Sequence, residues 1–142
     1  MLSNILVPVD GSENALRALN LAVYIARNTD AKITAMHVIE NPPTVYVGSQ
    51  KLLNDLLAKF RAESSNILDN CKQIAEKSKV KIETIVSEGD DIASNIVRYA
   101  QKGGFDTVII GRQGTGRFKE MLLGSISNKV LHHANCSVMV VR

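Results

Sequence analysis

The residues best suited to chemistry in this sequence lie in the glycine-rich stretch from Thr107 to Ser127, which reads TVIIGRQGTGRFKEMLLGSIS. Gly111, Gly114 and Gly116 follow a short apolar run, and a helical pattern resumes only after Gly124. Glycine lets backbone N–H groups turn outward at φ values that other residues resist, and a helix start adds unpaired N–H donors and a positive dipole end. A loop built in this way can hold a phosphate group.

Polar side chains in the same stretch also suit an anion. Arg112, Arg117 and Lys119 add positive charge, and Ser125 is suited to cap the next helix or to hydrogen-bond an anion. We expect Ser125 to cap that helix with or without a bound ligand. The alternative for the two arginines is that they are solvated charges, and Lys119 and Glu120 are interpreted as part of a solvated face.

The loop matches neither of two well-defined phosphate-binding patterns. It contains no Gly-x-x-x-x-Gly-Lys-Ser/Thr sequence of a Walker loop and no Gly-x-Gly-x-x-Gly dinucleotide fingerprint. Taken alone, the stretch fits two interpretations: an anion-binding loop, or a strand-to-helix connection whose glycines serve only turns.

The composition is that of a soluble globular domain. The chain has 142 residues, a formal net charge of +3, three tyrosines, three phenylalanines and no tryptophan, so a nucleic-acid surface is disfavoured. Its apolar runs are too short to span a bilayer, and its start lacks the features of a signal peptide. We therefore expect one cytoplasmic domain, with no membrane partner and no nucleic-acid partner.

The cysteines and histidines do not form a recognisable site. Cys71 and Cys136 have no CxxC spacing, and we interpret both as buried small hydrophobic residues rather than as a disulfide or metal ligands. His37 lies in an apolar strand, and His132 and His133 are neighbours on a helix. None of them forms a convincing catalytic pair.

Strand and helix patterns alternate along the chain. The predicted strands are Asn4 to Val9, Lys32 to Ile39, Lys81 to Val86, Val108 to Ile110 and Ser137 to Arg142. The predicted helices are one that Ser12 caps and Asn28 to Asp30 closes, Lys51 to about Lys77, Ile92 to Lys102, and Ser125 to Ala134. This alternation predicts an α/β fold: a five-stranded parallel sheet with right-handed crossovers and helices on both faces.

Two strand ends of such a sheet carry suitable polar chemistry. Open parallel sheets bind ligands outside the carboxyl ends of their strands, where the strand order reverses. Asp10 follows the first predicted strand and Gly111 ends the fourth. The alternative for Asp10 is that it merely caps the first helix beside Ser12.

The whole chain resembles one protein family. Gly111-x-x-Gly114, nine further residues and then Gly124-Ser125 resemble the nucleotide-binding signature of the ATP-binding branch of the universal stress protein family. The segments ILVPVDGSENALRAL, HVI, Glu88-Gly89-Asp90, FDTVIIG and LGSISNKVLHHANCSVMVV also look like family elements in family order. Ser137 stands where many relatives have a proline.

The resemblance implies the fold and the nucleoside part of a site. It implies one domain, residues 1–142, with strand order 3-2-1-4-5 and a Rossmann-like, adenine nucleotide alpha hydrolase-like architecture, which places strands one and four side by side. Pro8, Val9 and Asp10 would line the adenine and ribose end, with Asp10 accepting hydrogen bonds from sugar hydroxyls or the base amine. Val38 would meet adenine through its backbone.

The resemblance also implies a phosphate site and a cofactor. Gly111, Arg112 and Gly114 would hold the ribose and phosphate, and the outer phosphates would meet Gly124, Ser125 and Ile126. The nucleotide would be ATP, or ADP or AMP, and a divalent metal, Mg²⁺, would be carried by the phosphates rather than by a protein cage.

Three functions follow as hypotheses. The first is an ATP-binding stress-response or regulatory module whose nucleotide orders the loops at the strand ends. The second is an ATPase or autophosphorylating protein. Its turnover would be slow, because no catalytic base is evident near Ser125. The third is a dimeric scaffold without nucleotide. A flavin carrier is disfavoured because the loops are poor in aromatic residues, and Tyr46 is the only obvious candidate for stacking on the flavin ring. We expect a homodimer that pairs the edge strand Ser137 to Arg142.

Overall fold

The computed structural model describes residues 2–43, 48–115 and 123–142, which form five strands and four helices in alternation. In chain order these are β1 (Asn4–Pro8), α1 (Glu13–Arg27), β2 (Lys32–Glu40), α2 (Gln50–Lys77), β3 (Ile82–Gly89), α3 (Ile92–Lys102), β4 (Thr107–Gly111), α4 (Ser125–His133) and β5 (Ser137–Val141). The predicted α/β alternation is confirmed. Predictions for Tyr46, Gly116, Arg117, Lys119 and Glu120 lie outside the described residues.

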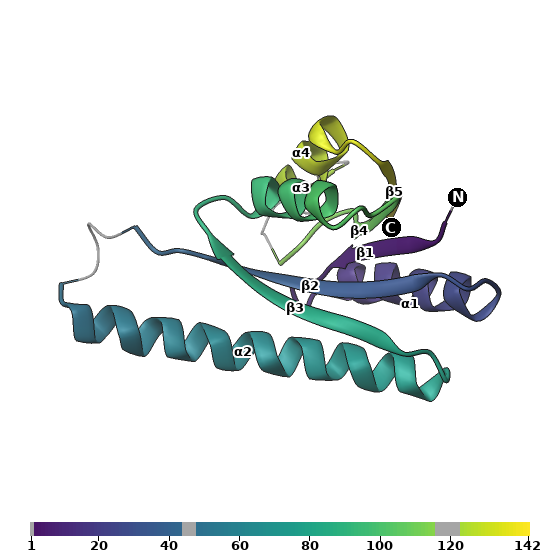
Figure 1. Ribbon diagram of the computed structural model, residues 1–142. Helices are drawn as coiled ribbons and strands as arrows, with labels where there is room; N and C mark the ends of the chain where they lie inside the picture. Colours follow the sequence, from purple (N-terminus) through teal and green to yellow (C-terminus); the bar gives the residue numbers. More distant parts are fainter. Residues whose placement is uncertain (1, 44–47, 116–122) are drawn as a thin grey trace.

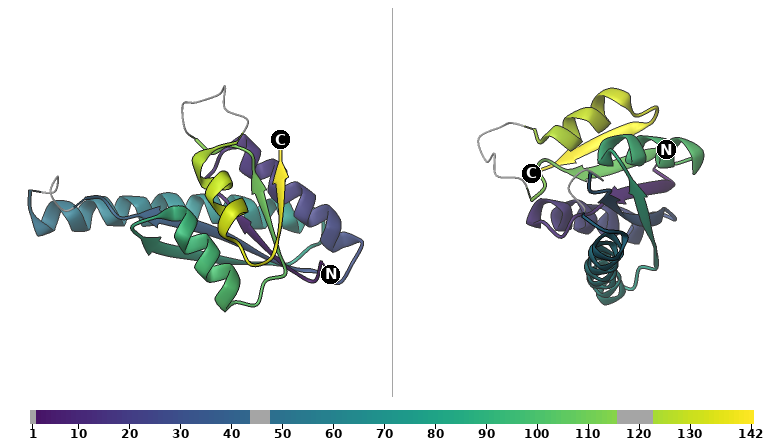
Figure 2. Two further views of the ribbon diagram at one scale, coloured as in Figure 1. Left: turned by 90° about the horizontal axis from the view of Figure 1, so that it is seen from above. Right: turned by 90° about the vertical axis from the view of Figure 1, so that its left-hand side faces the viewer.

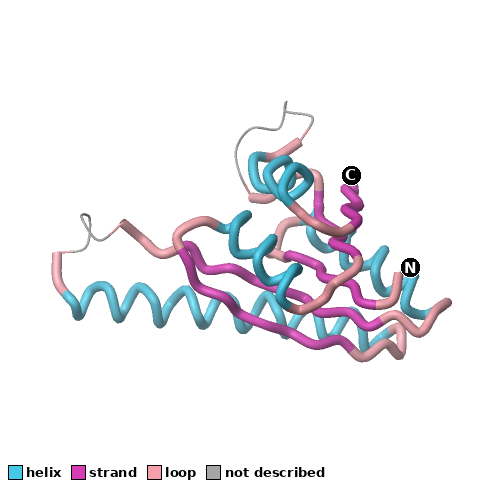
Figure 3. The backbone as a smooth tube through the Cα atoms, turned by 45° about the horizontal axis from the view of Figure 1, so that its top comes forward, coloured by secondary structure: helices cyan, strands magenta, loops and turns pink. Residues whose placement is uncertain are grey.

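The five strands form one parallel sheet in the order β3-β2-β1-β4-β5, as the resemblance implied. Figure 3 shows them running side by side between two sets of helices. Strand β1 is central because its continuous apolar sequence suits a strand that is covered on both faces. Since β1 pairs with both β2 and β4, the residues that follow these three strands meet at one edge of the sheet.

Strand β3 extends further than its apolar pattern predicted. Pairing with β2 continues beyond Val86, through Ser87 and Glu88, to Gly89 opposite Glu40. Ladder hydrogen bonds come from the backbone, so an edge strand can continue through polar residues that a hydrophobic pattern does not register. The pair β2 and β3 therefore projects beyond β1 and forms one side of the carboxyl edge.

Helices cover both faces of the sheet, as Figure 2 shows. On one face, buried residues of α1 and α2 pack against β1, β2 and β4 around Ile5, Val7 and Ile109. On the other face, α3 and α4 pack around Leu6, Val108 and Val130. The fold therefore has three layers with a separate apolar core on each side of the sheet.

Helix α2 has 28 residues, which corresponds to a length of about 42 Å. Its second half is bound to the sheet through Cys71 and Ala75, which are fully buried. Its first half runs past the body of the molecule (Figure 1), so Leu53 and Phe60 are half-buried and Leu52 is 59% exposed. No described helix is both long enough and apolar enough to cross a membrane.

The two cysteines differ in their surroundings. Cys71 is buried in α2, where burial raises the pKa of its thiol to about 11. Cys136, just before β5, is half-buried, and burial also raises the pKa of its thiol. Both are free thiols, so the prediction of small buried residues is confirmed for Cys71 and only in part for Cys136.

Candidate functional site

A pocket of about 550 Å³ opens at the carboxyl ends of β1, β2 and β4. Its lining includes nine of the ten residues that the resemblance assigned to a nucleotide: Pro8, Val9, Asp10, Val38, Gly111, Gly114, Gly124, Ser125 and Ile126. The strand order brings these residues together although up to about a hundred positions separate them in sequence.

One side of the pocket is hydrophobic. We call it the apolar wall, and it consists of Val38, Ile92, Ile96, Ile110 and Ile126. These side chains come from β2, α3, β4 and α4, on the face of the sheet that α3 and α4 cover. The isoleucines of α3 were missed by sequence reasoning, because their helical spacing marks a buried face without showing that the face borders a cavity.

The other side of the pocket is polar and has two parts. The carboxylate end consists of Asp10 and Ser12, which follow β1, and of His37, which lies within β2. The glycine end contains the loop after β4 and the start of α4, including Gly111, Gly114, Gly124 and Ser125. The first end presents side chains, whereas the second presents mainly backbone.

Asp10 connects the two ends. Its Oδ1 accepts a hydrogen bond from the backbone N–H of Ser12 at 2.9 Å, and its Oδ2 accepts one from the backbone N–H of Thr115 at 3.1 Å. The helix cap of α1 is Ser12, whose Oγ accepts from the N–H of Ala15 at 3.2 Å. The alternative that Asp10 caps α1 is therefore wrong, and its carboxylate instead joins β1 to the glycine loop.

Close packing explains two glycines of the loop. A Cβ on Gly111 would lie 2.7 Å from the carbonyl carbon of Asn14, inside the backbone of α1. A Cβ on Gly114 would overlap the Asp10 Oδ2 atom. Neither glycine has a positive φ, so space rather than backbone conformation limits both positions: the backbone of α1 at Gly111 and the end of the Asp10 side chain at Gly114.

The start of α4 is fixed by the loop that precedes it. The N–H of Gly124 donates to the carbonyl of Arg112 at 2.8 Å, and the Ser127 Oγ lies 2.7 Å from the same oxygen. Gly124 is the N-cap residue, and Ser125 is the first residue of the helix. The prediction that Ser125 caps this helix is therefore wrong, because the bond to Arg112 places the extended cap residue one position earlier.

The amino end of α4 differs from those of the other described helices. Ser12, Ser49 and Asp91 each cap their helix with a side-chain oxygen, whereas Gly124 makes no side-chain hydrogen bond. Helix α4 therefore directs first-turn N–H groups, without a side-chain cap, toward a pocket that Ser125 and Ile126 line. Such a helix end favours a negatively charged ligand.

Arg112 is the predicted site residue that the structure does not place in the pocket lining. Its backbone N–H donates to the carbonyl of Val141 at 2.6 Å, and its carbonyl receives the bonds from Gly124 and Ser127. Its Nε atom is buried without a partner among the described residues. In this structure, Arg112 therefore contributes to the site by joining β4, β5 and α4.

His37 was found by sequence reasoning only as a strand residue. Its Nδ1 lies 2.6 Å from the Oγ of Ser64 on α2, and the residue lines the pocket near Asp10. Burial lowers the pKa of His37 below its usual value, while the charges of Asp10 and Glu63 act in the opposite direction. No group of three or more His, Cys, Asp or Glu within the described ranges is arranged to hold a metal ion.

The fold and the site together define a class of protein. A parallel sheet in this order, with glycines beside an aspartate at its carboxyl edge, has the Rossmann-like architecture of the adenine nucleotide alpha hydrolase-like type. The sequence model of the universal stress protein family matches residues 1–142. The chain belongs to the universal stress protein family.

Individual relatives agree with this assignment. The chain is 31% identical over 150 residues to the universal stress protein YxiE of Bacillus subtilis, and the match covers 100% of both chains. The structure of the universal stress protein UspA from Lactobacillus plantarum is similar with a TM-score of 0.87 and 30% identity, over 99% of this chain and 98% of that chain.

More distant members of the family have been solved with adenine nucleotides. They include a universal stress protein in complex with cAMP, at 24% identity and a TM-score of 0.75, and the Archaeoglobus fulgidus protein in complex with dAMP, at 21% and 0.73. The Arabidopsis thaliana protein with AMP bound is 20% identical, with a TM-score of 0.72. At these sequence identities, the similarity shows only that these proteins share the fold of the present chain.

Proposed function

We propose that residues 1–142 form a single universal stress protein-like domain that binds ATP, or ADP or AMP, and acts as a regulatory module in a stress response. The observation that carries the proposal is the meeting of an apolar wall, an aspartate and an uncapped helix end around one pocket. A base needs an apolar surface, a sugar needs hydrogen-bond acceptors, and phosphates need N–H donors.

In the proposed complex, the three parts of the nucleotide occupy the three parts of the pocket. The base packs on the apolar wall and meets the backbone of Val38, and the sugar lies beside Asp10, near Pro8 and Val9. The phosphates lie at the glycine end, where backbone N–H groups and the Ser125 hydroxyl donate to them. The side chain of Arg112 is left out of this contact, in contrast to the expectation from the resemblance.

The proposed metal is Mg²⁺, held by the phosphates. Among the described residues, Asp10 supplies the only carboxylate of the pocket lining, and no group of acidic side chains forms a metal cage. Mg²⁺ keeps most of its waters and is commonly bound by substrate phosphates with few protein ligands, so this donor set fits it. The metal would neutralise phosphate charge when bound.

The mechanism of regulation that we propose is ordering by the ligand. Asp10 already receives the N–H of Thr115, so a sugar hydroxyl that hydrogen-bonds to Asp10 acts on the same carboxylate that holds the glycine loop. A nucleotide that contacts both ends would couple occupancy to the shape of this edge of the molecule.

The first experiment is to purify the protein without added nucleotide, denature it, and identify the released small molecule by chromatography and mass spectrometry. We expect a near-stoichiometric adenine nucleotide, and the ratio of ATP to ADP separates a binder from a slow hydrolase. An empty protein that also fails to bind ATP with Mg²⁺ in calorimetry would contradict the proposal and favour a scaffold.

A matched pair of variants tests where the phosphates bind. Gly114→Val places a side chain against the Asp10 carboxylate and should abolish binding of ATP in calorimetry while the circular dichroism spectrum is retained. Gly48→Val is the control, because a Cβ there meets no atom within 4 Å. Unchanged affinity of the Gly114 variant would show that the phosphates do not lie at this loop.

We also propose that the protein is a homodimer that pairs β5 of two copies. Within the described part of the chain, β5 is an edge strand with β4 as its one partner, and four of its five residues are half-buried. Natural proteins cover such edges because they invite pairing with other chains. Sedimentation velocity over a wide range of protein concentration should give a dimer, and a monomer at every concentration would exclude it.

A further inference from the structure

His37 lies at the carboxylate end of the pocket with its ring turned toward α2. It precedes Val38, whose side chain belongs to the apolar wall on the opposite face of the sheet. The His37 Nδ1 lies 2.6 Å from the Oγ of Ser64, a residue with no exposed surface. Helix α2 therefore fixes the Nδ1 side of the imidazole ring, whereas the Nε2 atom lies on the other side.

The direction of this hydrogen bond follows from a second contact. The Ser64 Oγ also lies 2.9 Å from the backbone carbonyl of Phe60, and a carbonyl oxygen can only accept. A hydroxyl carries one hydrogen, so Ser64 donates it to Phe60 and accepts from His37. The hydrogen of the neutral imidazole is thereby assigned to Nδ1, and the Nε2 atom carries a lone pair.

The second ring nitrogen of His37 is not enclosed by the protein. Within the described residues, the one fully buried side-chain nitrogen or oxygen without a partner is the Nε of Arg112, so the His37 Nε2 is not an enclosed orphan. No described residue is hydrogen-bonded to it, and His37 is one of the residues that line the pocket. The Nε2 is therefore an accessible hydrogen-bond acceptor on a residue of the pocket lining.

Two acceptors thus occur together at this end of the pocket. The Asp10 carboxylate is close enough to His37 for its charge to act on the imidazole, and it has accepting capacity beyond its bonds to Ser12 and Thr115. Two acceptors at one end suit a ligand group with two adjacent donors. The vicinal hydroxyls of a ribose are such a group.

We propose that His37 is a specificity-determining residue, whose Nε2 accepts a hydrogen bond from a ribose hydroxyl of the bound nucleotide, and that Ser64 is its positioning residue. This inference rests on the proposed nucleotide-binding function and deepens it. Asp10 takes one hydroxyl and His37 the other, so the pocket selects ribonucleotides over deoxyribonucleotides. Loss of either hydroxyl leaves one acceptor without its donor.

The binding test compares ATP, 2′-dATP and 3′-dATP with Mg²⁺ in calorimetry at pH 7.5, where an imidazole of ordinary or lowered pKa is neutral. For the parent protein we expect each deoxy form to bind about three- to tenfold more weakly, the usual effect of one lost hydrogen bond. His37→Asn keeps a donor for Ser64 but has no group at the Nε2 position. It should lose the discrimination against one deoxy form only.

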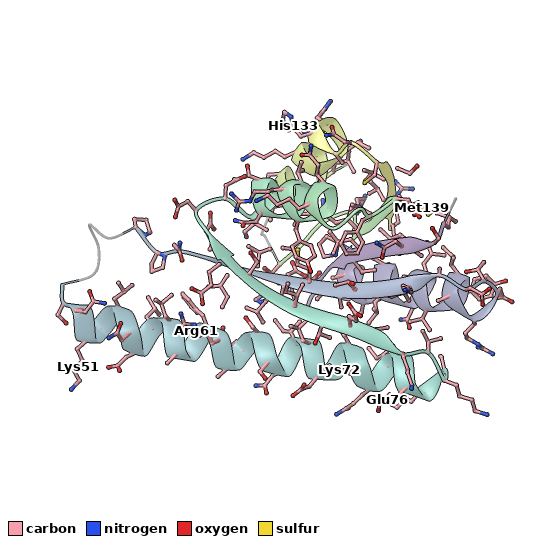
Figure 4. The ribbon with its side chains drawn as sticks, viewed as in Figure 1. Lys51, Arg61, Lys72, Glu76, His133 and Met139 are labelled. Atoms are coloured by element: carbon pink, nitrogen blue, oxygen red, sulfur yellow. The ribbon has the colours of Figure 1, made fainter. Side chains whose placement is uncertain are left out.

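A control variant and two contradictory outcomes distinguish failure of this inference from failure of the proposed function. His133→Asn, at the exposed carboxyl end of α4 in Figure 4, should keep the parent discrimination against both deoxy forms. If His37→Asn also keeps both, the inference is wrong while the nucleotide site stands. If no nucleotide binds the parent protein at all, the proposed function itself fails.

The tautomer can be tested without any ligand. Nitrogen-15 NMR of the imidazole should show the Nδ1–H form for His37 in the parent protein, and Ser64→Ala should shift it toward the Nε2–H form. In that form Nε2 is a donor, so Ser64→Ala should weaken ATP binding and lose the same discrimination as His37→Asn. An Nε2–H tautomer in the parent protein would overturn the assignment of the acceptor.

Discussion

The two polar ends of the pocket are built in opposite ways. The carboxylate end depends on side chains, with Asp10 held by backbone N–H groups and His37 held by Ser64. The glycine end depends on the absence of side chains, since Gly111 and Gly114 each lie where a Cβ would meet other atoms. The first should be sensitive to charge and protonation, and the second to added volume.

The two ends of the pocket also differ in what they contribute to the fold. Gly111 touches the backbone of α1, so the glycine end is continuous with the packing of β4 against that helix. Asp10 follows β1 and His37 lies within β2, and neither residue belongs to either hydrophobic core. Changes at the glycine end should therefore affect stability, and changes at the carboxylate end should affect mainly binding.

The largest expected effect comes from Gly111→Ala. Its Cβ would meet backbone atoms of Asn14 and Ala15, which cannot move without shifting α1 from the sheet. Forced overpacking of this kind costs about 1 to 3 kcal/mol, and we expect a value near the upper end of this range, measured by urea unfolding. Gly48→Ala, where nothing lies within 4 Å, should unfold like the parent. Equal midpoints for the two variants would refute the close-packing argument.

Asp10→Ala should have the next largest effect, on binding rather than on stability. Removing a charged acceptor should weaken ATP, ADP, AMP and adenosine alike by roughly ten- to a hundredfold, because hydrogen bonds to charged groups contribute more than neutral ones. Calorimetry with the four ligands measures this. If only the triphosphate lost affinity, Asp10 would act on the phosphates and not on the sugar.

Most of the helices and strands can be predicted from the sequence, because their patterns are local. The apolar runs of β1 and β4 and the periodicity of α1 and α3 are local properties, so each element can be found within its own segment. The strand order and the pocket residues came from the family resemblance. Both place Asp10 beside the glycine loop, as observed in the structure.

What the sequence did not predict depends on contacts between distant segments. His37 and Ser64 are 27 residues apart, and nothing in either segment indicates that they meet. The cap of α4 is decided by a bond from Gly124 to Arg112 across a loop, and not by the serine that follows. The extension of β3 depends on backbone pairing with β2, and backbone pairing does not require apolar side chains.

The carboxylate end should also make stability depend on pH. Because burial lowers the pKa of His37 in the folded protein relative to the unfolded chain, its contribution is fully present above about pH 6.5 and is lost as the pH falls through the lower, folded-state pKa. Urea unfolding between pH 5 and pH 7.5 should show a shallower dependence in His37→Asn than in the parent. His133→Asn should not flatten the profile, and if it does, the effect is not specific to the buried ring.

The smallest expected effect concerns the ion pair that holds α2 beside the carboxyl end of β3. Arg61, labelled in Figure 4, binds both carboxylate oxygens of Glu88, at 2.6 Å and 3.2 Å, and hydrogen bonding lowers the pKa of Glu88. Both side chains are partly exposed, at 57% and 34%, so solvent screens the pair. Arg61→Ala should therefore lower the urea midpoint only slightly.

The same variant tests whether the two ends of the pocket are independent, because Arg61 lies one helical turn before Ser64 on α2. If the ion pair helps to align the helix, the fraction of His37 in the Nδ1–H tautomer should fall slightly in Arg61→Ala, while the affinity for inorganic triphosphate at the glycine end stays unchanged. Lys51→Ala, at the far end of the same helix in Figure 4, is the matched control. A loss of triphosphate affinity in Arg61→Ala would mean that the two ends of the pocket are not independent.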